Sequence, residues 1–171
     1  YAGTKNDGVL MSANYGSTWF QINAGLPSNI SIKTLAINGN NIFAGTLGAG
    51  VYLSTNSGFN WTAANIGLLS TAQVYAFAIS GNSIYVGTSD GVYLSSNNGG
   101  LWTSVNTGLT NLNVGSLAIS GSTIFAGTQS GIFISTNNGS SWTGLAPISS
   151  VISIAVSGNN IFAGSFSGLY L

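Results

Sequence analysis

Hydrophobic residues in this chain occur in short runs of four to seven residues, and Gly, Asn or Ser bounds each run. Four of these runs end in an Asn-Gly or Ser-Gly pair, at residues 35–39, 77–81, 117–121 and 154–158. Runs of this length, rich in aromatic and β-branched residues, are typical of β-strands joined by tight turns. No stretch has apolar residues at helical spacing, so the pattern predicts an all-β protein.

The strand pattern repeats along the chain. Trp19, Trp61, Trp102 and Trp142 are separated by 42, 41 and 40 residues, and each ends a segment of the form Ser-x-Asn-x-Gly-x-x-Trp. A regular period of about 40 residues indicates a repeat architecture. The shared positions of this segment are Ser12, Asn14, Gly16, Trp19, Ser54, Asn56, Gly58, Trp61, Ser95, Asn97, Gly99, Trp102, Ser135, Asn137, Gly139 and Trp142.

Two further blocks recur in each repeat. An aromatic-Ala/Val-Gly-Thr/Ser block occupies residues 1–4, 43–46, 85–88, 125–128 and 162–165. A Gly and an apolar run follow it at residues 8–11, 50–53, 91–94, 131–134 and 168–171. With the runs above and a strand starting at each Trp, a unit of about 41 residues holds four strands, which we name A to D from the inside outward. Four strands per unit predict a β-propeller of four-stranded antiparallel blades.

The repeat frame places strand B at the start of the chain and strand C at its end. Residues 1–11 recur in register as 161–171, so the chain holds about 4.5 blade lengths. We expect residues 1–171 to form a single propeller array that belongs to a longer one. In the alternative, the surplus terminal strands pair with another chain, because bare strand edges favour self-association.

Charged residues are rare. Lys5, Asp7, Lys33 and Asp90 are the only ones, the net charge is zero, and Arg, Glu, His and Cys are absent. Nucleic acids and anionic membranes attract clustered Lys or Arg, so neither is expected as a partner. No run approaches the length of a transmembrane helix, so membrane insertion is not expected either. The missing ligand types predict no metal and no cofactor, and no nucleophile triad can form without His.

The Ser-x-Asn-x-Gly-x-x-Trp segment resembles the Asp-box, or bacterial neuraminidase (BNR) repeat, of sialidases, sortilin-type receptors and two-propeller xyloglucan-cleaving enzymes. The resemblance covers the whole chain in four copies, and the wider repeats are similar to those of secreted bacterial surface proteins. It implies a propeller whose Asn accepts backbone N–H bonds, whose Gly adopts a positive φ, and whose Trp locks each turn against its blade. The family's Asp is Asn14, Asn56, Asn97 and Asn137 here.

The resemblance also implies a test for catalysis. Sialidases use an Arg triad, a Tyr nucleophile, a Glu and an Asp, whereas this chain has no Arg and no Glu. A two-carboxylate glycosidase would have to use Asp7 and Asp90, which occupy the same loop slot of two different units. Each precedes a Gly, as Asp commonly does in a hairpin turn. No catalytic residue is therefore predicted, and the chain is not expected to be an enzyme.

A binding surface remains as the functional prediction. In the usual propeller layout the D–A and B–C loops share one face, opposite the Ser-x-Asn-x-Gly-x-x-Trp turns. All four charged residues map to that face, together with two aromatic residues outside the repeat pattern. The predicted ligand-binding residues are Lys5, Asp7, Lys33, Tyr75, Asp90 and Phe166. The alternative is that these side chains only form turns and pack at strand ends.

These observations favour a secreted or cell-surface, non-catalytic interaction and adhesion module that binds a glycan (carbohydrate) or a protein. Two alternatives stay open. The chain could be a structural building block of an extracellular assembly joined through its terminal strands. It could also be the propeller portion of a glycan-degrading enzyme whose catalytic residues lie outside this piece.

Overall fold

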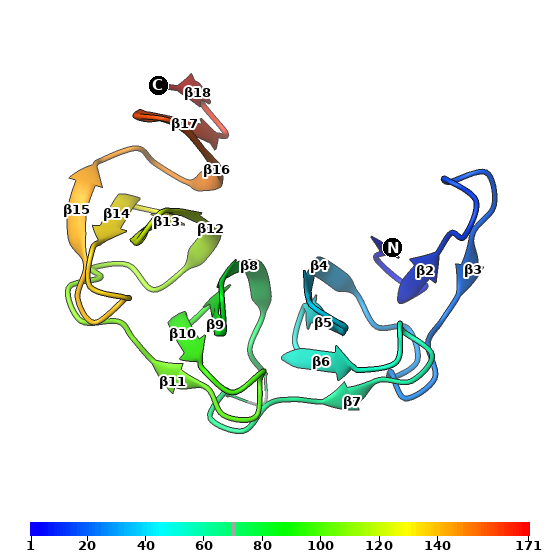
Figure 1. The fold of residues 1–171 in the computed structure, drawn as a ribbon. Coiled ribbons are helices and arrows are strands. Elements are labelled where there is room, and N and C mark those ends of the chain that lie inside the picture. The colour runs from blue at the N-terminus through cyan, green and yellow to red at the C-terminus, as the bar shows by residue number, and fades with distance from the viewer. Residues whose placement is uncertain (70) are drawn as a thin grey trace.

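The computed structural model describes residues 1–69 and 71–171, which form five antiparallel sheets side by side along an open arc (Figure 1). We call them units 1 to 5. Unit 1 contains β1 (Ala2–Gly3), β2 (Val9–Met11) and β3 (Phe20–Gln21). Unit 2 contains β4 (Ile32–Asn38), β5 (Asn41–Thr46), β6 (Val51–Ser54) and β7 (Thr62–Ala63). Unit 3 contains β8 (Val74–Ser80), β9 (Ser83–Thr88), β10 (Gly91–Ser95) and β11 (Thr103–Ser104).

Unit 4 contains β12 (Val114–Ser120), β13 (Thr123–Thr128), β14 (Gly131–Ser135) and β15 (Thr143–Ala146). Unit 5 contains β16 (Val151–Ser157), β17 (Asn160–Ser165) and β18 (Gly168–Tyr170). Consecutive strands pair with each other in every sheet, so each unit is a simple meander. The described residues therefore contain 18 strands and no helix, including none long and apolar enough to cross a membrane.

The order of the strands from the centre outward matches the predicted order A to D. Strands β4, β8, β12 and β16 face the centre of the arc, and β3, β7, β11 and β15 form its outer side (Figure 1). Unit 1 contains strands B to D and unit 5 contains strands A to C. The N-terminus and the C-terminus lie apart, at the two ends of the arc (Figure 1).

The core lies between neighbouring sheets. In β5, Phe43 and Ala44 point to opposite faces, and both are fully buried. Phe43 packs towards unit 3, where its ring centroid lies 6.1 Å from that of Phe77, while Ala44 belongs to the cluster shared with unit 1. Because the sheets of units 2 to 4 are covered on both faces, their B strands have no solvent side, which explains why these runs are apolar without alternation.

The Ser-x-Asn-x-Gly-x-x-Trp segment forms a hydrogen-bonded turn between strands C and D. In unit 2 the Ser54 hydroxyl donates to Oδ1 of Asn56 (2.9 Å) and accepts the amide of Gly58 (2.8 Å). The same Oδ1 accepts the amide of Asn60 at 2.9 Å. Gly58 has a φ of 88°, a conformation that Gly adopts without steric cost. In unit 2 Asn56 thus accepts a backbone amide, and Gly58 provides the positive φ of the turn.

In units 2 to 4 the Trp of the turn also hydrogen-bonds to the preceding unit, a contact that the sequence did not predict. The indole Nε1 of Trp61 donates to the carbonyl of Ile22 (2.7 Å), and its amide donates to the carbonyl of Ala24 (2.8 Å). Trp102 and Trp142 repeat both hydrogen bonds one and two units further along. We call this pair of hydrogen bonds the Trp clasp.

Candidate functional site

Each inner strand contains a β-bulge at its second residue. The register shifts at Lys33 in β4, Tyr75 in β8, Gly115 in β12 and Ile152 in β16. A bulge adds an unpaired residue, bends the strand and changes the direction in which a side chain points. All four bulge residues line a single cavity on the inner side of the arc. The fold thus brings four equivalent positions from four units together.

The flanking residues show which part of this arrangement is scaffold. The residue before each bulge is Ile32, Val74, Val114 or Val151, and each is at least 95% buried. The bulge position itself varies in every unit, from Lys to Tyr to Gly to Ile. A constant apolar anchor next to a variable residue is typical of a scaffold that presents different side chains to a ligand.

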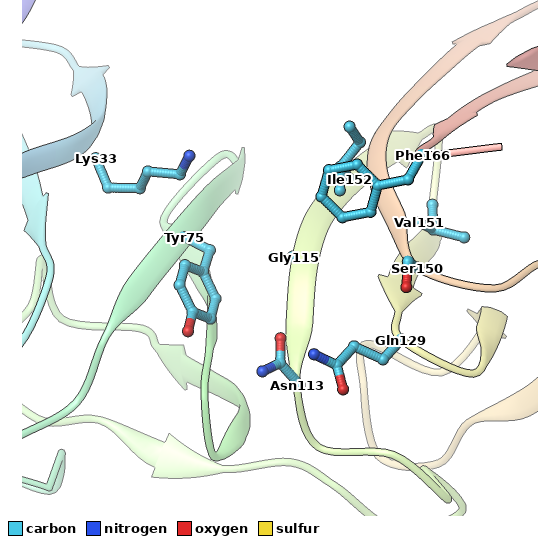
Figure 2. Close-up of a pocket in the computed structure, with 9 residues that line it drawn as sticks. All are labelled: Lys33, Tyr75, Asn113, Gly115, Gln129, Ser150, Val151, Ile152 and Phe166. Carbon is cyan, nitrogen blue, oxygen red and sulfur yellow. The ribbon is translucent and has the colours of Figure 1, made fainter. Parts of the chain in front are cut away.

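The cavity has a volume of about 480 Å³. Figure 2 shows Lys33 and Tyr75 on one side, and Ile152 and Phe166 on the other. Gly115 lies between the two sides and has no side chain to fill the space. The amides of Asn113 and Gln129, together with Ser150 and Val151, complete the lining (Figure 2).

Hydrogen bonds hold the cavity's two groups of loops together. The amide of Ser150, in the D–A loop, donates to the carbonyl of Gln129 in the B–C loop at 2.9 Å. Between the same two loops of unit 2 the bond runs in the opposite direction, because the amide of Leu47 in the B–C loop donates to the carbonyl of Ser31 in the D–A loop at 3.1 Å. The D–A and B–C loops therefore share one face, as predicted. The hydroxyl of Tyr75 donates to Oε1 of Gln73 at 2.9 Å, which orients the ring.

The cavity can provide several kinds of contact to a ligand. Lys33 is the one charged side chain among the described residues that line it, so the local charge is positive. Tyr75 is half-buried, whereas Phe166 is 84% exposed, and both rings present a flat apolar surface. Asn113 and Gln129 each carry an amide that can both donate and accept hydrogen bonds. Rings combined with amides suit a ligand with mixed apolar and polar surface.

Three of the six predicted binding residues meet in this cavity, namely Lys33, Tyr75 and Phe166. Lys5, Asp7 and Asp90 are not part of its lining. Lys5 lies in the B–C loop of unit 1, next to the turn formed by Asp7.

The two aspartates have local roles in turns. The amide of Asp7 donates to Oγ1 of Thr4 at 2.9 Å, and the amide of Asp90 donates to Oγ1 of Thr88 at 3.0 Å. The carboxylate of Asp90 accepts the hydroxyl of Ser89 at 2.9 Å. Burial and the nearby charge of Asp90 raise the pKa of the Tyr93 hydroxyl. The described residues hold no group of three or more metal-ligating side chains.

Sequence reasoning missed Gly115, Ile152, Asn113 and Gln129 because it considered only charged residues and aromatic residues outside the repeat. The signal was present in the repeats. Gln129 and Phe166 occupy the same slot of two B–C loops, directly after the Thr or Ser that ends strand B, and this slot differs in every unit. Variation at this slot would have pointed to Gln129, and variation at the bulge position would have pointed to Gly115 and Ile152.

A series of four-stranded meanders arranged around a cavity lined by their inner strands defines a β-propeller. The sequence matches the DUF6242 beta propeller domain over residues 18–153. The chain belongs to this family, and the predicted all-β propeller of four-stranded antiparallel blades is confirmed.

Several solved structures share the fold. An ancestral GH74 enzyme is 24% identical with a TM-score of 0.74, and the match covers 94% of this chain and 25% of that one. The extracellular domain assigned to hybrid two component system BT3049 from B. thetaiotaomicron is 17% identical with a TM-score of 0.76, covering 95% and 24%. YCF48 bound to D1 peptide is 15% identical with a TM-score of 0.70, covering 95% and 55%.

The chain therefore spans about a quarter of the GH74 enzyme and of the B. thetaiotaomicron domain. At these identities the likeness shows the fold alone. No curated protein matched the sequence.

Proposed function

We propose that the chain is a non-catalytic, extracellular β-propeller module that binds a glycan or a protein in the cavity lined by the four bulges. The observation that carries this proposal is the contrast between the constant buried anchors, such as Val74, and the variable bulge residues beside them, such as Tyr75. A role in adhesion or recognition uses this variation, because each unit contributes a different contact to one ligand.

The chemistry of the cavity supports either kind of ligand. The rings of Tyr75 and Phe166 can stack on a sugar or on an apolar peptide side chain. Asn113 and Gln129 can bind hydroxyls or peptide groups, and Lys33 favours a carboxylate. The neighbours from B. thetaiotaomicron are extracellular domains, and YCF48 binds a peptide. These likenesses support a secreted or cell-surface location and a protein ligand as well as a glycan.

We further assign the turns to the Asp-box (BNR) type, with Asn in the place of Asp. The hydrogen bonds of Ser54, Asn56 and Gly58 support this assignment, because Oδ1 of Asn makes the acceptor contacts that an Asp carboxylate would make.

Two alternatives rest on separate observations. The likeness to a GH74 enzyme favours a propeller portion of a glycan-degrading enzyme whose catalytic residues lie outside residues 1–171. In this chain, Asp7 and Asp90 form turns in different units, which supports a non-catalytic role for it. The exposed side chain of Trp19 favours the second alternative, in which the chain is a building block of a longer array or of an assembly. In that case residues 1–171 form a single array within the longer one.

The test is a binding screen of the protein against a glycan array and a displayed peptide library. Tyr75→Ala and Phe166→Ala should each weaken binding of any hit about tenfold, because a stacked ring contributes about 0.5–1.5 kcal/mol beyond its buried area. Phe59→Ala is the matched control, since this ring is 65% exposed but lies in a turn outside the cavity. Wild-type binding by both cavity variants, or no hit on either array, would contradict the proposal.

A further inference from the structure

Trp19 differs from the other three repeat tryptophans. Its side chain is 46% exposed, whereas Trp61, Trp102 and Trp142 are only 1%, 2% and 4% exposed. Its indole Nε1 donates to the carbonyl of Gly16 in its own turn, at 3.1 Å, instead of to a neighbouring unit. Trp19 therefore occupies the clasp position of its turn but makes no clasp hydrogen bond to another unit among the described residues.

The turn that carries Trp19 is nevertheless fully formed. The amide of Gly16 donates to the hydroxyl of Ser12 at 2.8 Å, and the amide of Thr18 donates to Oδ1 of Asn14 at 2.9 Å. These bonds match those of the buried turns in units 2 to 4. The surface around Trp19 is thus preorganised in the geometry that the clasp requires.

The three filled clasps show what covers such a Trp. In each, the preceding unit supplies an Asn-x-Gly-Leu segment, at residues 23–26, 65–68 and 106–109. A Cβ on Gly25 would lie 2.0 Å from the carbonyl oxygen of Trp61, and Gly67 and Gly108 meet the next Trp in the same way. Only Gly leaves room for the Trp backbone at this point.

A second contact accompanies the clasp. The hydroxyl of Tyr85, in strand B of unit 3, donates to the carbonyl of Asn138 in the turn of unit 4, at 3.3 Å. Tyr1 makes the same contact with Ser57 at 3.1 Å. Tyr15 occupies the matching turn position in unit 1 and is fully exposed. Its carbonyl is therefore available to a Tyr from strand B of another repeat.

A second copy of this chain does not fit as the occupant. Its Asn-x-Gly-Leu segments are already filled by its own Trp61, Trp102 and Trp142. In unit 4 the corresponding residues are Ala146, Pro147 and Ile148, so Ile148 stands where the clasp requires Gly. The fourth segment cannot receive a Trp backbone in the same geometry.

We propose that the side of unit 1 that carries Trp19 and Tyr15 is a docking surface for a further propeller repeat. The repeat it fits has an unfilled Asn-x-Gly-Leu segment after its outer strand and a Tyr in strand B. This inference is independent of the proposed ligand cavity, because it rests on the interface between units.

The test extends the chain at its N-terminus with a copy of residues 85–124, which continues the repeat frame into Tyr1. The copied Trp102 is changed to Phe, so that Trp19 remains the indole under study. Acrylamide should quench one exposed indole in the wild-type protein, and Trp19→Phe should remove this component. In the extended chain the quenchable component should be lost. The matched control carries Gly108→Ile in the copy, imitating Ile148, and should leave Trp19 quenchable.

Equal quenching of Trp19 in the wild-type and the extended chain would overturn the proposal. So would a concentration-dependent dimer of the wild-type protein in which Trp19 is protected, because a second copy would then be the occupant. Trp19→Ser provides a measurement that needs no extension. We expect it to leave the denaturation midpoint unchanged while Trp61→Ser lowers it, whereas equal losses would show that Trp19 serves only the packing of unit 1.

Discussion

Trp61 and Ile22 lie 39 residues apart, yet the indole Nε1 of Trp61 donates a hydrogen bond of 2.7 Å to the carbonyl oxygen of Ile22. The bond joins the turn of one blade to the residue that follows the last strand of the preceding blade, β3. It satisfies a buried carbonyl and a buried indole N–H at once, and both would be costly to leave unpaired. The repeated Ser-x-Asn-x-Gly-x-x-Trp segment therefore both closes the turn within a blade and links that blade to the preceding one.

Replacing Trp61 with Phe should destabilise the protein by about 2–3 kcal/mol, because the Ile22 carbonyl loses its donor and the smaller ring leaves a void. Trp19→Phe should change stability by less than about 0.5 kcal/mol, as is usual at exposed sites. Chemical denaturation of both variants measures the difference. Equal effects of the two substitutions would contradict the clasp.

Gly25→Ala should be more disruptive than Gly39→Ala, although both residues have positive φ values, of 89° and 58°. A Cβ at Gly25 meets the Trp61 carbonyl at 2.0 Å, whereas a Cβ at Gly39 meets nothing within 4 Å. Gly39→Ala should cost about 1 kcal/mol from backbone strain alone. Gly25→Ala adds displacement of the clasp, so its denaturation midpoint should fall well below that of Gly39→Ala.

Asn56→Asp should preserve the turn at neutral pH, whereas Asn56→Ala should cost about 1–3 kcal/mol through two lost hydrogen bonds. The introduced carboxylate would accept the Ser54 hydroxyl and the Asn60 amide, which lowers its pKa in the folded state. Its contribution is therefore present above the unfolded pKa of about 3.9 and is lost as pH falls through the folded value. Unfolding curves at neutral and acidic pH test this. An Asp variant as unstable as the Ala variant at neutral pH would refute it.

Alkaline pH should destabilise the protein through Tyr93. Burial and the charge of Asp90 raise its pKa above the ordinary 10.0, so the unfolded chain releases this proton first. Stability from this group is fully present below pH 10.0 and is lost as pH rises through the folded-state pKa. Asp90→Asn should lower the pKa of Tyr93 in a spectroscopic titration. An unchanged titration would remove Asp90 as a cause.

Much of the fold could be predicted because the same strand and turn residues recur in every repeat. The spacing of Trp19, Trp61 and later tryptophans defined the blade, and the Ser, Asn and Gly of each turn formed the expected hydrogen bonds. The direction of the Trp contacts was not predictable, since a sequence period does not say which neighbouring blade a side chain reaches. The structure was needed to show it.

The site was only half predictable for a related reason. Lys33, Tyr75 and Phe166 stood out as exceptions to the repeat and do line one cavity. A bulge, however, depends on strand register, which the hydrophobic pattern did not reveal. Gly115 contributes to the site by lacking a side chain, so no rule based on functional groups would have selected it.

The interface between units 4 and 5 buries Phe125, Ile132, Val151 and Ala163. Here Ile148 stands at the position that Gly25, Gly67 and Gly108 occupy in the clasps. In repeat proteins stability is approximately a sum of intrinsic repeat terms and nearest-neighbour interface terms. Without the Gly of the clasp, this junction lacks one of those interface terms. Amide hydrogen exchange should therefore be faster in β16 and β17 than in the matching strands of units 2 and 3.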